Sequence, residues 1–293
     1  MRIPDARVYA NAASRTMKAR GKIEKGVEQV STGLRVAQPW DDPAAARTIA
    51  IQTSSIDRYK SLERTTGFAV SQLRAQDNAM GDVAEALTRS LELAVQMSND
   101  SFDENHRADA SVEVRGLFDR VIAALNHEQN GRYLFAGSLE QDPPFDANGN
   151  YLGDTNMREM EAAPGVTLPV SIRADLRMTA AGGGVDVPSV LSDLKAALET
   201  NDRAGVQATI DGLHSAIQQT GNSRAEIGRL MLNWEGAQVV AQNAHDELIV
   251  ARAKLSDMDL AEASTNLAMA ERAFDAAITA SAKGFELSLL KRL

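Results

Sequence analysis

Residues 260–288, LAEASTNLAMAERAFDAAITASAKGFELS, hold the clearest periodic pattern in the chain. Small or apolar residues recur there at steps of three and four, at Leu260, Ala263, Leu267, Ala270, Phe274, Ala277, Ser281, Phe285 and Ser288. Such spacing is typical of an a/d seam on a helix that packs against a second helix. No local partner follows, so the seam predicts contact with a distant part of the chain.

The other end of the chain carries a weaker form of this pattern. Between residues 6 and 34, four apolar side chains step four, three and four apart, and three glycines weaken the helix by up to about 1 kcal/mol each relative to alanine. We predict that the two terminal seams pack on each other. The candidate contact residues are Ile23, Val27, Val30, Leu34, Leu260, Leu267, Phe274, Phe285 and Leu289.

Long helices are also predicted between the two ends. One runs from about Pro43 to Asn99, which is roughly 80 Å at 1.5 Å per residue. A second covers residues 104–130 and ends at Asn130-Gly131, a typical C-terminal stop. Three more cover residues 188–199, 203–220 and 224–255, with breaks near Asn201 and Gly221. Aromatic residues make up only 4% of the chain, which suits thin helical seams better than one thick core.

The pattern changes between residues 139 and 187, where prolines concentrate. Asn148-Gly149, between Phe145 and Tyr151, predicts a hairpin turn, and residues 166–172 alternate as a strand would. The triple glycine at residues 182–184 predicts a flexible exit. The fold class is therefore mainly α, a long antiparallel helical bundle or coiled-coil rod formed by both chain ends, with a small β-rich insert in the middle.

This reading divides the chain into five segments. They are an N-terminal assembly helix (1–42), the first half of a long-helix rod (43–138), the β-rich outer insert (139–187), the second half of the rod (188–255) and a C-terminal assembly helix (256–293). The same a/d spacing also fits the core of an ordinary helical bundle, so periodicity alone does not separate an intramolecular core from a contact between copies.

Charge and composition argue against several classes of function. The net charge of −9 disfavours a whole-protein nucleic-acid binder, and the basic N-terminal stretch has only Tyr9 for base stacking. The chain has no cysteine, no run of about 18 apolar residues and no secretory signal pattern. We expect no nucleic-acid partner, no membrane insertion, no metal and no cofactor.

Two acidic motifs contain residue types that can bind metal or act as acids and bases. Residues 146–157 begin like a calcium loop, with Asp146, Asn148 and Asn150, but lack the glycine and glutamate that such a loop needs later. Asp41 and Asp42 are adjacent carboxylates, and Pro43 makes Asp42 a natural helix N-cap rather than a catalytic acid.

Several motifs resemble those of a known family. Residues 29–35 (QVSTGLR) and 39–46 (PWDDPAAA) resemble the N-terminal signature of bacterial flagellins and their relatives. Residues 224–228 (RAEIG) resemble the family's return helix, and residues 257–267 (DMDLAEASTNL), 280–283 (ASAK) and 287–290 (LSLL) resemble its C-terminal signature. Residues 146–187 match no motif of the family.

Two details favour the hook-associated branch of this family over flagellin itself. The first is the form DDPAA at residues 41–45 of the N-terminal motif. The second is the stretch YLFAGS at residues 133–138, followed by PPF at residues 143–145. The family motif residues are Asp41, Asp42, Pro43, Tyr133, Leu134, Phe135 and Gly137.

The resemblance implies a structural, non-enzymatic subunit of the extracellular bacterial flagellum. It would join the hook, through hook-associated protein 1, to the flagellin filament, in a ring of copies of itself. It also implies export from the cytoplasm through the flagellar type III system, with an export chaperone on the C-terminal helix. The alternatives are a short flagellin and a cytoplasmic helical adaptor or sensor rod. An enzyme is the most distant reading.

Overall fold

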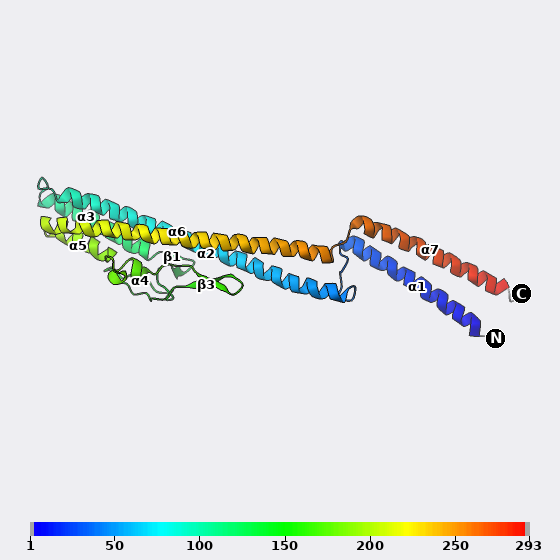
Figure 1. Ribbon diagram of the computed structural model, residues 1–293. Helices are drawn as coiled ribbons and strands as arrows, with labels where there is room; N and C mark the ends of the chain where they lie inside the picture. The colour runs from blue at the N-terminus through cyan, green and yellow to red at the C-terminus, as the bar shows by residue number, and fades with distance from the viewer. Residues whose placement is uncertain (1–2, 291–293) are drawn as a thin grey trace. The chain divides into compact units, whose positions relative to one another are not determined.

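The computed structural model describes residues 3–290, without the side chains of residues 3–6, 8, 9 and 284–290. The chain divides into two compact units. Unit 1 comprises residues 1–58 and 244–293, and unit 2 comprises residues 59–243. The helices α1 (Ile3–Thr32) and α7 (Leu260–Leu290) belong to unit 1 (Figure 1).

Long helices dominate the molecule, which confirms the predicted mainly α fold. They are α2 (Pro43–Met97), α3 (Glu104–Leu125), α5 (Val187–Glu199) and α6 (Arg203–Ser256). α2 begins where the sequence predicts, because Pro43 takes the first helical position and the Asp42 carboxylate accepts the Ala45 N–H at 3.0 Å.

Unit 2 holds the continuous apolar core. Its buried members all lie between Ala69 and Trp234, and α3 packs against α5. Ion pairs tie further helices together: Arg224 of α6 binds Asp77 of α2 at 2.9 Å, and Arg120 of α3 binds Asp82 of α2 at 3.0 Å. These contacts agree with the side-by-side helices in Figure 1.

Two predicted helix ends are wrong. α3 stops at Leu125, and Asn130-Gly131, with φ of 54° and 77°, forms the turn between β1 (Glu128–Gln129) and β2 (Arg132–Tyr133) instead. Positive φ at both positions is the geometry of a tight hairpin turn, which an Asn-Gly pair supplies as readily as a helix stop. Gly221, predicted to break a helix, lies inside the continuous α6, where the packing of the long helix outweighs the weak helix propensity of glycine.

The insert contains fewer strands than its composition suggests. β3 (Glu159–Ala163) pairs antiparallel with β4 (Val166–Pro169), and the predicted turn brings Phe145 and Tyr151 into an antiparallel bridge. The remainder is loops, the short helix α4 (Ala174–Arg177) and the 3₁₀ turn η1 (Ala180–Gly182). The Asp146 carboxylate accepts the Asn148 and Asn150 N–H groups at 2.8 Å each, so this segment folds as the predicted hairpin turn.

Side chains from the long helices hydrogen-bond the backbone at the end of β4 and just after it. The buried amide of Gln76 in α2 donates to the Val170 carbonyl (2.9 Å) and accepts the Ile172 N–H (3.3 Å). The indole N–H of Trp234 in α6 donates to the Pro169 carbonyl (2.8 Å). Since an unpaired backbone group inside a core costs stability, these side chains allow an irregular segment to be buried.

Two more amides hold other parts of the insert in the same way. Asn126 donates to the Phe145 carbonyl (2.8 Å) and accepts its N–H (2.9 Å). Gln219 of α6 donates to the Arg177 and Val185 carbonyls and accepts the Val185 N–H at 3.0 Å. The insert is thus fixed on the helices of unit 2 at several points.

The triple glycine is therefore a packed turn, and its prediction as a flexible exit is wrong. A Cβ atom at Gly182 would lie 2.1 Å from the Leu176 carbonyl oxygen, and one at Gly184 would lie 2.0 Å from Oε1 of Gln219. Gly183 has a φ of 80°. Close approach explains Gly182 and Gly184, and the left-handed backbone explains Gly183.

Candidate assembly surfaces

The predicted pairing of the chain ends is present in unit 1, where α1 packs along α7. On α7 the least exposed described positions are Ala263, Leu267, Ala270, Phe274, Ala277 and Ser281, together with Ala268. Apart from Ala268 these follow the predicted seam. Leu260, which should begin it, is 57% exposed. The side chains of Phe285 and Leu289 lie outside the described residues.

The α1 side of the pair differs from the prediction. Ile23 and Val30 are half-buried, but Val27 is 50% exposed, and Gly26 faces α7 instead. A Cβ atom at Gly26 would lie 3.1 Å from Cδ1 of Leu267. Gly26 therefore lets the two backbones approach closely, so it has a packing role in addition to its weak helix propensity. The signal that was missed is a glycine at a seam position, one turn below Val30.

A short antiparallel contact joins the segment after α1 to the segment after α6. Met258 donates its N–H to the Gly33 carbonyl (2.9 Å), and Arg35 donates its N–H to the Ser256 carbonyl (2.6 Å). Gly33 ends α1 with a φ of 70°, and the half-buried Leu34 pairs with Asp257 in an isolated bridge. We name this contact the joint. The joint holds the segment between α1 and α2 against the segment between α6 and α7.

Asp41 and Asp42 form ion pairs with basic side chains of unit 1. Lys25 of α1 lies 2.8 Å from Asp41, and this ion pair holds the pKa of that carboxyl below its usual range. The pKa of Asp42 is also lowered. The larger cause is the hydrogen bond from the Ala45 N–H, and the second is the guanidinium of Arg35, 3.2 Å away. Both carboxylates have structural partners, so their geometry supports a capping and tethering role.

The stretch at residues 133–138 forms a buried turn of unit 2. Leu134 and Phe135 are buried, Tyr133 lies in β2, and Gly137 has a φ of 72°. A Cβ atom at Gly137 would lie only 1.9 Å from Oδ1 of Asp154. This family motif therefore supports the fold of the insert.

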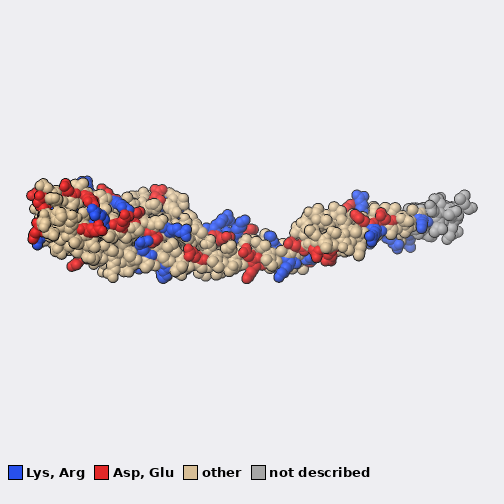
Figure 2. All heavy atoms as spheres, turned by 90° about the horizontal axis from the view of Figure 1, so that it is seen from above, with Lys and Arg blue, Asp and Glu red and all other residues tan. Residues whose placement is uncertain are grey.

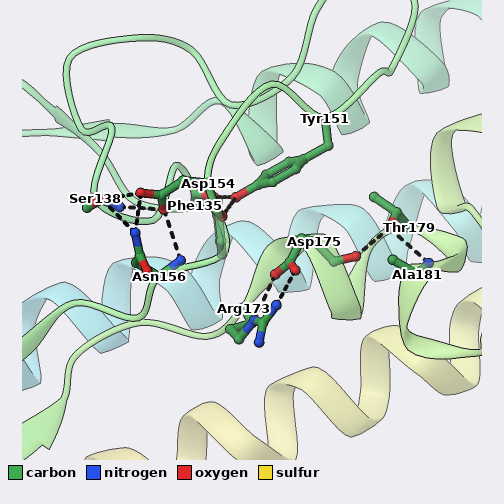
Figure 3. A network of polar contacts seen from close by, with 9 residues as sticks. All are labelled: Phe135, Ser138, Tyr151, Asp154, Asn156, Arg173, Asp175, Thr179 and Ala181. Carbon is green, nitrogen blue, oxygen red and sulfur yellow. Dashed lines mark hydrogen bonds and ion pairs between the residues drawn. The ribbon is translucent and has the colours of Figure 1, made fainter.

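Asp154 anchors that turn, as Figure 3 shows. Its carboxylate accepts the Ser138 N–H (2.9 Å) and hydroxyl and the Asn156 side-chain amide (2.9 Å), and these bonds lower its pKa to about 2. The Tyr151 hydroxyl donates to the Asp154 carbonyl (2.8 Å), with the Phe135 carbonyl at 3.2 Å, while burial raises the pKa of Tyr151 to about 12. The network joins two loops of the insert.

Unit 1 exposes a second apolar stripe on α7, on the helix face next to the seam to α1. The stripe consists of Met269, Ala273, Ala276 and Ala280, which step four, three and four apart and are all exposed. Met269 is 61% exposed. An apolar surface that extends beyond the face covered by α1 is typical of a helix that contacts a further neighbour. We name this stripe the outer stripe.

Within the part of the chain that the structure describes, no group of three or more histidine, aspartate or glutamate side chains could hold a metal ion. None of the described helices is both long and apolar enough to cross a bilayer.

Comparison with known proteins points to one family. Residues 6–140 match the model of the bacterial flagellin N-terminal helical region. Flagellar hook-associated protein 3 of Salmonella typhimurium is 31% identical over 157 residues, which cover 52% of this chain and 49% of that protein. The aligned region thus spans about half the length of this relative. The flagellar filament core protein flaB2 of Brachyspira hyodysenteriae is 25% identical over 270 residues, covering 89% of this chain and 88% of that protein.

The fold has solved counterparts. The crystal structure of flagellar hook associated protein-3 from Legionella pneumophila superposes with a TM-score of 0.61 at 14% identity, over 71% of this chain and 98% of that one. The matched N-terminal region and the aligned relatives make this chain similar to bacterial flagellins and flagellar hook-associated proteins, and the solved structure shows that it shares their mainly α fold.

Proposed function

We propose that this protein is the subunit that joins the hook of the bacterial flagellum to the flagellin filament. Copies of the chain would form a ring in the axis, with hook-associated protein 1 on one side and flagellin on the other. The identity to hook-associated protein 3 supports this choice within the family. The expected extracellular site, export through the type III system and chaperone on α7 are parts of the same proposal, as is the absence of catalytic activity.

The outer stripe on α7 is the observation that carries an assembly role. The seam through Leu267 and Phe274 is satisfied inside the chain by α1, whereas Met269, Ala273 and Ala276 are exposed. Unit 1 also exposes Met17, Trp40 and other large apolar side chains, half of all such side chains among the described residues although it is the smaller unit. Contiguous exposed apolar surface of this kind marks interaction sites.

Substitutions on the two faces of α7 test the assembly role. Leu267→Asp or Phe274→Asp places a charge between α1 and α7 and should block incorporation into flagella while unit 2 stays folded. Ala276→Asp should block incorporation with the α1–α7 pair intact, because it charges only the outer stripe. Thr279→Asp, exposed and away from both faces, is the matched control. Normal motility in all three test variants would contradict this account of α7.

A short flagellin is the second candidate, because a filament core protein aligns with 89% of this chain. A deletion strain distinguishes it from the junction protein. Without a junction subunit, cells should retain the hook and release flagellin monomers into the medium. Loss of the filament alone, with every junction protein still in place, would support flagellin. Protein found only in the cytoplasm would support the adaptor reading.

A further inference from the structure

One exposed face of α2 in unit 2 is basic. Lys60, Arg64, Gly67, Ser71 and Arg74 recur at steps of four, three, four and three and so share one face of the helix. Lys60, Arg64 and Arg74 are exposed, and none of the three has an ion pair among the described residues. We name this face the basic strip.

The same face of α2 is covered further along the helix. At Asp82, Glu85 and Arg89 it meets α3, through the ion pairs of Arg120 and Glu113. α3 ends at Leu125, before it reaches the strip, and beyond that end Gln129 donates a hydrogen bond of 3.4 Å to Ser71. The basic strip therefore continues a helix-packing face, and its three basic side chains have no ion pair in the described part of the chain.

Charge is unevenly distributed within unit 2. Between Tyr59 and Asn78 the acidic residues are Glu63 and Asp77, and Asp77 is bound by Arg224. Figure 2 shows a group of Lys and Arg side chains partway along the face that it draws. Three unpaired cations on one helix face favour contact with an acidic surface.

Unit 2 carries an acidic surface of suitable shape between α5 and α6. A groove of about 500 Å³ there is lined by Asp193 and Asp202 and by small residues that include Ala196, Gly205 and Ala208. No basic side chain lines it. The small lining would admit the backbone of a helix whose own contact residues are small, as Gly67 and Ser71 are.

We propose that the basic strip of one copy docks in the α5–α6 groove of the next copy. The proposal rests on the proposed function, for which it names the surface that links neighbouring subunits. Because the two surfaces differ, the contact is heterologous and repeats from copy to copy, which yields a ring when the rotation closes. The opposite charges would fix orientation and register more than they add affinity.

Engineered cysteines test the contact, since the natural chain contains none. Full-length protein with Gly67→Cys is mixed at low salt with full-length protein carrying Ala196→Cys, and a short bis-maleimide is added. Space is open at Gly67, and Ala196 is exposed. We expect cross-linking about tenfold above that of Gly116→Cys mixed with Ala196→Cys, because Gly116 is an equally open glycine on α3. Equal yields would overturn the proposal.

Charge exchange supplies the second arm of the test. Joint substitution of Lys60, Arg64 and Arg74 by glutamate should lower the specific cross-link about tenfold, and Asp193→Lys on the partner copy should restore part of it. No loss, or no restoration while circular dichroism shows folded protein, would count against the contact. In a separate experiment, wild-type flagella are labelled with an antibody against this protein. Absence of the protein from the flagellum would refute the proposed function. The contact between copies is tested by the cross-linking yields alone.

Discussion

At the scale of single residues, the family motif at residues 133–138 owes its glycine to one contact. Gly137→Ala would add a Cβ atom next to Asp154 and place it on a backbone with positive φ. Gly131→Ala meets the second difficulty alone, because nothing lies within 4 Å of its Cβ position. The left-handed backbone should cost each variant about 1–2 kcal/mol. We expect chemical denaturation to show a clearly larger loss for Gly137→Ala, and equal losses would contradict the contact.

Asp154 should also give unit 2 a specific dependence on pH. Its folded pKa of about 2 is lower than the ordinary 3.8, so the folded state binds this proton less readily than the unfolded state does. The carboxylate therefore contributes its full stabilisation above the ordinary pKa and loses it as the pH falls toward 2. The free energy of unfolding of wild type should exceed that of Asp154→Asn near neutral pH, with the difference shrinking in this window. A constant difference would contradict the role of the ionised carboxylate.

At the scale of secondary-structure elements, glycine has opposite effects at two positions of α1. Gly21 is exposed with open space around its Cβ position, whereas Gly26 touches Leu267 of α7. Gly21→Ala should stabilise the helix by up to about 1 kcal/mol. Gly26→Val should separate α1 from α7, because a branched side chain cannot fit 3.1 Å from Leu267. Hydrogen exchange of the α1 amides should therefore slow in the first variant and accelerate in the second.

The elements also show what could be predicted from the sequence. The α2 helix and the α7 seam were predictable because each depends on a period that neighbouring residues carry. The end of α3 was not, because Asn130-Gly131 suits a hairpin turn as well as a helix stop. The amide of Gln76 was not either, because its partners lie 94 and 96 residues away and no local pattern marks them. The motif residues Asp41 and Gly137 were found by resemblance, and their physical roles became clear only from Lys25 and Asp154.

At the scale of the whole molecule, burial is divided unequally between the units. The core cluster lies entirely within unit 2, whereas the buried apolar residues described in unit 1 are Val36, Ala45, Ile56 and Ala263. α1 and α7 hold each other mostly through half-buried side chains, and most of the stability of a helix in a protein comes from the packing of its apolar face. The local free energy of opening should therefore be low in unit 1 and should approach the global value in unit 2.

Limited trypsin digestion of the monomer should reveal this difference. Both units offer exposed sites, such as Arg15 and Arg20 in α1 and Arg74 and Arg229 in unit 2, so the protease itself does not favour either. We expect residues 1–40 and 256–293 to be removed first, leaving a resistant fragment that contains unit 2, because cleavage follows the population of locally opened chain. The same terminal sites should become protected once copies assemble, since contacts on the outer stripe supply the burial that the single chain lacks. Cleavage of Arg74 at the rate of Arg15 in the monomer would show that the terminal helices are as stable as the core, and the chain would then need no neighbours to complete its fold.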